Sequence, residues 1–392
     1  MKKLLGIVAF AAVVAAAPAH ATNGMRLTGF GPVQQSMGGA SVAAPLDAVT
    51  AVTNPAGLSL LAPQIEVAGA AFSPTVKYDI GGQGATSSRP TDFLPTLAAA
   101  FRANDAITVG VAALGTAGMG VDYKDFGGPG AEMMSSYLNG RIAPAVAYKV
   151  NDQLSAGLAL NLMYAQMKFA FPTPAGEVQP PSASSMGYGA TIGVTYAPTA
   201  AISIGAAYET QSYFGDFSFD VGGGQTMKVK LDQPMVGTLG VAVKPVEGLL
   251  IALDGQWINW SAVLGKNKPE TTPADQFNMN WADQFVVKVG AEYQIPALKE
   301  LKVRAGLNYG KTPVDKEQAS EALLFPAIAE LHASVGAGYD IGKLTVNASF
   351  MYSPEANVSG NITVPTPGGP VPMPYTTKMS QTEIQLGVGY RL

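Results

Sequence analysis

Hydrophobic and polar residues alternate strictly along most of the chain after residue 63. From Leu301 to Tyr309, every odd position is apolar and every even position is polar or glycine. The same period recurs in the segments 154–164, 186–196, 331–340, 344–352 and 384–392. Because successive side chains of a strand point to opposite faces, each segment predicts a β-strand with one apolar and one polar face.

The length of these segments and the position of their aromatic residues favour a transmembrane β-barrel over a soluble sandwich. Many segments reach the ~9–11 residues that a tilted spanning strand requires, against ~5–6 in soluble sheets. Tyrosines stand near strand ends, where interface girdles would place them. These are Tyr148, Tyr164, Tyr196, Tyr208, Tyr293, Tyr309, Tyr339, Tyr352 and Tyr390.

The connections between the segments alternate between short and long, as in outer-membrane barrels with short periplasmic turns and long outer loops. Short turns fall at 104–105, 151–152, 198–199, 245–248, 296–300 and 341–342. Long loops fall near 79–92, 117–136, 170–184, 215–228, 263–280, 312–329 and 356–379. These connections predict an all-β fold, a fourteen-stranded antiparallel transmembrane β-barrel over residues 63–392.

Composition agrees with a barrel and excludes several other classes. Charged residues make up 13% of the 392 residues, and the chain has 45 glycines, no cysteine and a net charge of −4. With hydrophobic residues at 47%, the chain is too apolar and too weakly charged to be disordered. The absence of cysteine excludes a disulfide scaffold, and the negative charge argues against a nucleic-acid partner.

Residues 1–21 predict a secretory signal peptide. Lys2 and Lys3 precede an apolar stretch, and Ala19-His20-Ala21 forms a small-residue cleavage site. An uncleaved anchor is the alternative, although the stretch is short for a spanning helix. Export without disulfides and without a spanning helix predicts the outer membrane of a Gram-negative cell.

Residues 22–62 lack the strand period and carry only Arg26 and Asp47 as charges. The segment is too apolar for a free linker and too irregular to face lipid, where unpaired backbone groups are costly. We therefore expect it to lie inside the barrel as a hatch.

In this segment the sequence resembles the long-chain fatty acid and hydrocarbon transporters of the FadL/TodX type. The resemblance rests on Asn23-Gly24, Gly29-Phe30-Gly31, Met37-Gly38-Gly39-Ala40 and the hatch motif formed by Asn54, Pro55, Ala56 and Gly57. It implies a monomeric barrel that takes up hydrophobic compounds passively, either long-chain fatty acids or aromatic and aliphatic hydrocarbons. In that family the solute passes from outer loops to an internal apolar pocket and leaves sideways into the membrane beside a kinked strand.

The chain departs from the family pattern in two places. The loop at 170–184 is short and rich in proline, so the outer capture groove is expected to be reduced or different. The last residue is Leu392 rather than an aromatic residue.

An apolar pocket is sufficient for such transport, because each buried CH₂ gains roughly 0.8 kcal/mol. The hatch side chains expected to line the pocket are Leu27, Phe30, Val33 and Met37. Alternatively, they only pack against the barrel wall.

A fatty acid would also need a cation for its carboxylate. Strand alternation places Arg141, Lys288, Lys302 and Arg304 on the face away from lipid. They are the candidate carboxylate contacts, with pairing to acids such as Glu209 and Glu292 as the alternative.

Gly115, Gly118 and Gly120 are the candidate strand kink, because glycine in a strand often marks a break. Alternatively, the last two merely begin a loop.

No enzymatic activity, cofactor or metal site is expected. After cleavage of the signal peptide, His332 is the only histidine, it lies in the middle of a strand, and no Gly-x-Ser-x-Gly elbow occurs. The partners expected are a hydrophobic small molecule and membrane lipid. A structural or adhesive plugged barrel without transport is the competing function.

Overall fold

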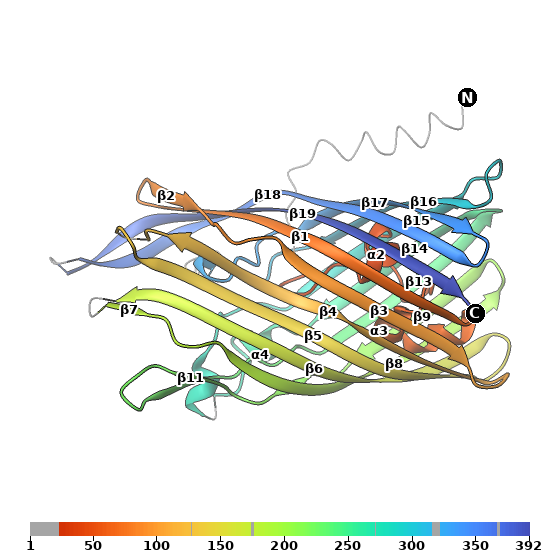
Figure 1. The fold of residues 1–392 in the computed structure, drawn as a ribbon, viewed down its shortest axis with the longest axis horizontal. Helices are drawn as coiled ribbons and strands as arrows, with labels where there is room; N and C mark the ends of the chain where they lie inside the picture. The colour runs from red at the N-terminus through yellow and green to blue at the C-terminus, as the bar shows by residue number, and fades with distance from the viewer. Residues whose placement is uncertain (1–22, 127, 174–175, 271, 316–321, 367–368) are drawn as a thin grey trace.

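The computed structural model describes residues 23–126, 128–173, 176–270, 272–315, 322–366 and 369–392. The predicted signal peptide lies outside these residues. Fourteen antiparallel strands close into the predicted barrel, and β1 pairs with β19 from Gln64↔Arg391 to Ile80↔Tyr375 (Figure 1). The barrel strands are β1 (Gln64–Ile80), β3 (Asp92–Arg102), β4 (Ile107–Lys124), β5 (Glu132–Lys149), β6 (Leu154–Thr173), β8 (Ala183–Thr199), β9 (Ile202–Glu209), β13 (Val236–Val246), β14 (Leu249–Ile258), β15 (Gln284–Gln294), β16 (Leu301–Gly310), β17 (Leu331–Ile341), β18 (Leu344–Thr366) and β19 (Gly369–Arg391).

The two faces of each strand differ as the alternation predicts. On β6, Leu160 and Leu162 are 51% and 48% exposed, whereas the intervening Asn161 is fully buried. Outward side chains are apolar because they face lipid, and the inward ones are small or polar. This arrangement accounts for the low charge of the chain, since charged groups are confined to the lumen and the two ends.

Several predicted loops are strands or hairpins at the end with the long connections. The sequence predicts a loop over 356–379, but β18 and β19 continue as one paired hairpin as far as Thr366↔Gly369. The strands continue because backbone pairing needs no lipid, only a neighbouring strand. Five short strands stand at this end, namely β2 (Gln83–Thr86), β7 (Gly176–Val178), β10 (Tyr213–Phe214), β11 (Phe217–Asp220) and β12 (Thr226–Val229).

Residues 23–62 lie inside the barrel as the predicted hatch (Figure 1). They contain α2 (Gly31–Ser36), α3 (Thr50–Thr53) and the 3₁₀ helix η2 (Pro55–Leu60). Pro32 and Pro55 stand in the first turns, where a missing N–H costs nothing. The helices are short, so they depend on packing against the barrel wall rather than on helix propensity.

Glycines of the wall make room for the hatch backbone. A Cβ atom added to Gly306 on β16 would overlap the backbone nitrogen of Gly38, and one added to Gly157 on β6 would overlap that of Ala56. The high glycine content therefore has a specific cause in the lumen.

Aromatic side chains pack together over the end with the long loops. Trp260 and Trp281 meet edge to face with ring centroids 5.1 Å apart, beside α4 (Ser261–Leu264) and the 3₁₀ helix η3 (Pro273–Gln276). Gly24 at the start of the hatch packs directly on Trp260. The hatch and the long loops thus contact each other across the lumen. Among the described helices, none has the length and apolar character needed to cross a membrane.

Candidate functional site

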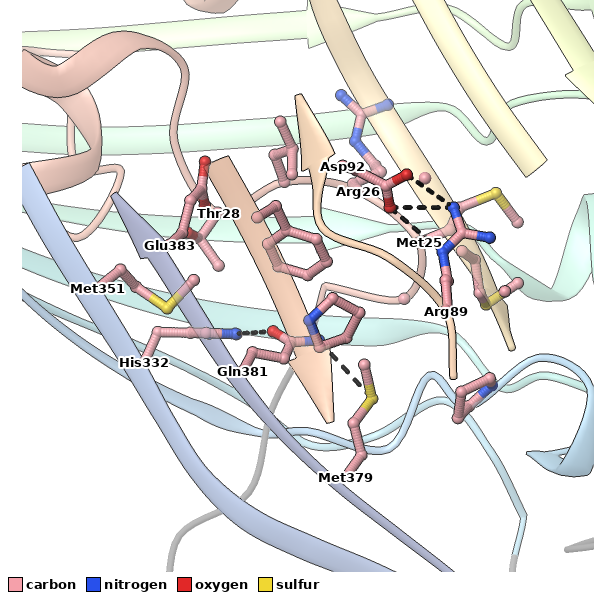
Figure 2. Close-up of a pocket in the computed structure, with 18 residues that line it drawn as sticks. Met25, Arg26, Thr28, Arg89, Asp92, His332, Met351, Met379, Gln381 and Glu383 are labelled. Atoms are coloured by element: carbon pink, nitrogen blue, oxygen red, sulfur yellow. Dashed lines mark hydrogen bonds and ion pairs between the residues drawn. The ribbon is translucent and has the colours of Figure 1, made fainter. Parts of the chain in front are cut away.

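A cavity lies between the first residues of the hatch and the barrel wall (Figure 2). Its apolar lining comes from the hatch, β1, β4, β18 and β19. These side chains are Met25, Leu27, Phe72, Met119, Met351 and Met379. Polar groups enter from His332 on β17 and from Gln381 and Glu383 on β19, beside Met351 and Met379 (Figure 2). The cavity has a volume of about 40 Å³, so it seats a small polar group as it stands, and its flexible methionine side chains must shift to admit an apolar molecule.

Beside this cavity the wall has a seam where β3 and β4 do not pair. Their ladder ends at Thr96↔Leu114, and the next residue of β3, Pro95, has no N–H to donate. Within β4 the register shifts between Gly115 and Ala117. The wall is therefore incompletely paired where the cavity reaches it.

The hatch supplies the hydrogen bonds that β3 does not make. The N–H of Leu27 donates to the carbonyl oxygen of Thr116 at 3.2 Å, and the N–H of Gly118 donates to that of Met25 at 3.1 Å. Further out, the N–H of Ser88, in the connection before β3, donates to the carbonyl oxygen of Asp122 on β4 at 2.7 Å. The seam is thus covered from inside by residues 25–27 of the hatch.

Arg89 crosses the outer part of the seam. Its guanidinium contacts Asp92 at the start of β3 at 2.9 Å, and its Nη1 donates to the carbonyl oxygen of Ser135 on β5 at 3.3 Å (Figure 2). Gly120 has φ +154°, and a Cβ there would lie 2.5 Å from Arg89 Nη1. A side chain at position 120 would therefore displace the arginine.

The predicted kink glycines all lie along this seam. Gly115 stands at the register shift, with an added Cβ only 2.9 Å from Leu94 Cδ2. Gly118 bonds to the hatch, and Gly120 makes room for Arg89. Leu94 fills the inner part of the seam.

The Asn-Pro-Ala-Gly motif joins the hatch to the wall. The side-chain amide of Asn54 donates to the carbonyl oxygens of Val42 at 2.6 Å and Val194 at 3.2 Å, and its Oδ1 accepts from Ala56 N–H. Pro55 and Ala56 pack on Gly157, and Gly57 packs on Pro45. The motif therefore positions the hatch and lies away from the cavity.

The predicted basic residues are buried or half-buried on the lumen side, and three of them pair with acids. Arg141 contacts Glu209 at 2.6 Å, Arg304 contacts Glu292 at 2.7 Å, and Lys302 contacts Asp340 at 3.3 Å. Lys288 lines a second cavity together with Asp254. A substrate carboxylate at any of the three pairs would compete with a protein carboxylate, although Nε and Nη1 of Arg141 have no hydrogen-bond partner within the described residues.

The predicted pocket side chains are spread over different surroundings. Leu27 lines the first and second cavities, and Phe30 lines the second. Val33 faces a separate cavity near the short turns. Met37 is fully buried against Gly290 on the wall.

Sequence reasoning missed Arg89 and the methionines of the cavity. Arg89 lies in the stretch 79–92, which has the composition of a loop, and nothing local indicates that it crosses to β5. A methionine on a lumen face is not distinguishable from a packing residue until strand register is known.

Glu209 holds two arginines in the lumen, which gives a test of this charge cluster. Arg26 of the hatch contacts it at 2.9 Å and Arg141 of β5 at 2.6 Å, and all three are nearly fully buried. Glu209→Gln leaves two buried cations unpaired, so we expect a loss of about 3–5 kcal/mol in unfolding free energy. Urea titration in detergent measures it.

The matched control is Glu355→Gln. Glu355 lies on the long β18–β19 hairpin and makes an exposed ion pair with Lys77 of β1, which the change removes. That change is expected to cost under about 1 kcal/mol. Equal stability losses in the two variants would contradict the role given to Glu209.

Comparisons with known proteins were made for both sequence and structure. The profile of a family described as outer membrane protein transport protein (OMPP1/FadL/TodX) matches residues 8–382. No curated protein matches the chain significantly.

Solved structures with this fold include two toluene transporters and a FadL homologue. The toluene transporter TodX of P. putida superposes with a TM-score of 0.74 at 18% identity, covering 93% of this chain and 99% of that one. A FadL homologue of Pseudomonas aeruginosa gives 0.72 at 16% identity, with 94% and 99% covered. The toluene transporter TbuX of Ralstonia pickettii gives 0.69 at 19% identity, with 93% and 99% covered. At these identities the likeness concerns the fold.

Proposed function

The chain belongs to the outer membrane protein transport protein family (OMPP1/FadL/TodX), and from this premise we propose that it carries hydrophobic compounds passively into the outer membrane. The observation that carries the proposal is the apolar cavity that meets an incompletely paired seam of the barrel wall. A cavity alone would store a solute, whereas a cavity beside a seam can release it sideways into lipid.

The energetics support a passive route. Transfer of a hydrocarbon from water to the cavity gains roughly 0.8 kcal/mol per buried CH₂, and the bilayer offers a similar environment. The solute therefore moves downhill without a coupled reaction, and we propose that the protein catalyses none. A structural or adhesive barrel would have no use for a cavity leading to a seam.

Release requires the segment 25–27 and the side chains of Leu94 and Arg89 to leave the seam. The segment makes two main-chain hydrogen bonds to β4 there, each worth about 1 kcal/mol net, and its Arg26 is also held by the buried ion pair with Glu209. Such an opening is small compared with unfolding of the wall. We propose that the protein acts as a monomer, with lipid around the apolar outer face.

The substrate class follows from the cavity and from the relatives. Two of the superposed structures are named toluene transporters, and we propose that this chain takes compounds of comparable hydrophobicity, hydrocarbons or fatty acids. The pairing of Arg141, Lys302 and Arg304 with acids favours an uncharged solute over an ionised one.

Uptake by whole cells tests the function. Cells carrying the gene are expected to accumulate labelled toluene or oleate several-fold faster than cells lacking it, and re-expression should restore the rate. Expression of an unrelated outer-membrane barrel is the control. Equal rates with and without the gene would overturn the proposed function.

A further inference from the structure

Four polar side chains form a row across neighbouring strands of the lumen wall. They are Asn308 on β16, His332 on β17, Ser353 on β18 and Gln381 on β19. Asn308 pairs with His332 in the strand register, and Ser353 pairs with Gln381. His332 and Ser353 adjoin the paired residues Ala333 and Tyr352. All four are buried, and the strand pairing places them side by side, so we call them the polar row.

Three atoms of the polar row have no hydrogen-bond partner within the described chain, although they are buried. They are Asn308 Oδ1, His332 Nδ1 and Ser353 Oγ. Buried polar atoms in native proteins are normally paired with protein, water or ligand. Of the four residues, His332 and Gln381 line the cavity, so His332 Nδ1 is the unpaired atom that a polar group bound there would meet, with Asn308 and Ser353 behind it.

The chemistry of these atoms defines that group. His332 Nε2 lies 3.1 Å from the amide oxygen of Gln381, so we assign the ring proton to Nε2. His332 Nδ1 is then an acceptor, and Asn308 Oδ1 is a second one because its amide nitrogen already donates to Gly38. The third atom, Ser353 Oγ, belongs to a hydroxyl that can both donate and accept, so the unpaired atom facing the cavity, His332 Nδ1, is the one that needs a hydrogen-bond donor.

The charges around the cavity oppose an ionised head group. The two cations that line it, Arg26 and Arg89, are held by Glu209 and Asp92. Glu383 lies two residues from Gln381 on the same strand face and adds an acid. A carboxylate placed here would meet acceptors and a carboxyl group, and a bare hydrocarbon would leave the acceptors unpaired.

The rest of the cavity suits an apolar body. Methionines at 25, 119, 351 and 379 surround it, and Phe72 adds an aromatic ring (Figure 2). Thioether side chains adapt their shape and contact aromatic rings favourably. Figure 2 shows His332 and Gln381 beside Met351 and Met379 on one wall, so a polar and an apolar contact can be made together.

We propose that the cavity binds a neutral hydrophobic compound that carries a hydroxyl group, with the hydroxyl donating to His332 Nδ1 of the polar row. An alkylphenol or a medium-chain alcohol has this chemistry. The inference rests on the proposed transport function and specifies its substrate.

Binding to the purified full-length barrel in detergent tests the proposal. Equilibrium dialysis would compare 4-propylphenol, propylbenzene and 4-propylbenzoate at neutral pH, where a phenol with a pKa near 10 is uncharged. We expect 4-propylphenol to bind about tenfold more tightly than either analogue, the factor that one hydrogen bond is worth. A second series of nonanol, nonane and nonanoate identifies whether the body is aromatic or aliphatic.

Two variants assign the preference to the polar row. His332→Phe keeps the ring but removes the acceptor, so the phenol should fall to the affinity of propylbenzene while propylbenzene binds as before. His332→Asn places an amide oxygen near the position of Nδ1 and should retain much of the preference. The comparison of ligands on the unaltered protein stands even if a variant fails to fold.

The outcomes separate this proposal from the transport function. Equal binding of alcohol and hydrocarbon in both series overturns the hydroxyl site but leaves transport intact. The same conclusion follows if His332→Phe keeps the full preference. Absence of binding by all compounds, together with equal cellular uptake with and without the gene, overturns both.

Discussion

Deletion of residues 23–62 is expected to convert the closed barrel into an ion-conducting pore. The hatch backbone lies so close to the wall that a side chain at Gly157 or Gly306 would overlap it. Barrels of eight strands are filled by their own side chains, whereas those of 16–18 leave an aqueous channel. A fourteen-stranded wall lined with glycine and alanine should therefore conduct once the hatch is gone.

Planar bilayer recording measures this effect directly. The full chain should show a quiet baseline, and the truncated chain should show resolved single-channel steps. Heat-dependent gel mobility checks that the truncated barrel has folded. The matched control is Asn54→Ala, which removes the side-chain bonds to Val42 and Val194 but leaves the hatch present, and it should conduct only in brief openings. A folded, silent truncated barrel would mean that the loops around Trp260 and Trp281 seal the lumen by themselves.

The wall and the hatch are predictable because each has a local signature. Alternation at period two is sufficient to assign side chains such as Arg141 and His332 to the lumen face. The segment 22–62 stands out because it lacks that period. Both inferences use only neighbouring residues, which is why they succeed.

The details of the seam depend on contacts between distant segments and are not predictable. The glycines at 115–120 indicate a break in β4, but the partner that fills it is the chain near Leu27, about ninety residues earlier. Arg89 reaches Ser135 on β5 across β4. The pairing of Arg141 with Glu209 likewise requires strand order, although the sequence names Glu209 as an available acid.

Strand register is also needed for the polar row. The sequence presents His332 as a lone histidine in a strand, for which a structural role is the simplest interpretation. Only the pairing of four strands places Asn308, Ser353 and Gln381 beside it. A group of unpaired atoms of this kind is visible in three dimensions and has no linear motif.

A disulfide across the seam is expected to stop transport reversibly. The chain has no cysteine, so an introduced pair is the only one that can form. A Cβ on Gly115 would lie 3.4 Å from the Cβ of Leu94, close to the usual disulfide separation of about 3.5–4.5 Å. In the oxidised Leu94→Cys, Gly115→Cys variant, uptake should fall to the rate of cells lacking the gene, and a reductant should restore it.

The control disulfide joins β18 and β19 at a point where the two strands are paired. A Cβ on Gly389 of β19 would lie 4.0 Å from the Cβ of its partner Thr345 on β18, so Thr345→Cys with Gly389→Cys introduces the same chemistry there. This control should transport equally well when oxidised or reduced. Ligand binding to the locked Leu94–Gly115 variant should persist, because the cavity is left in place and only its exit is closed. If the locked barrel transports as fast as the control, the solute does not leave between β3 and β4, and the lumen beneath the hatch becomes the route to test.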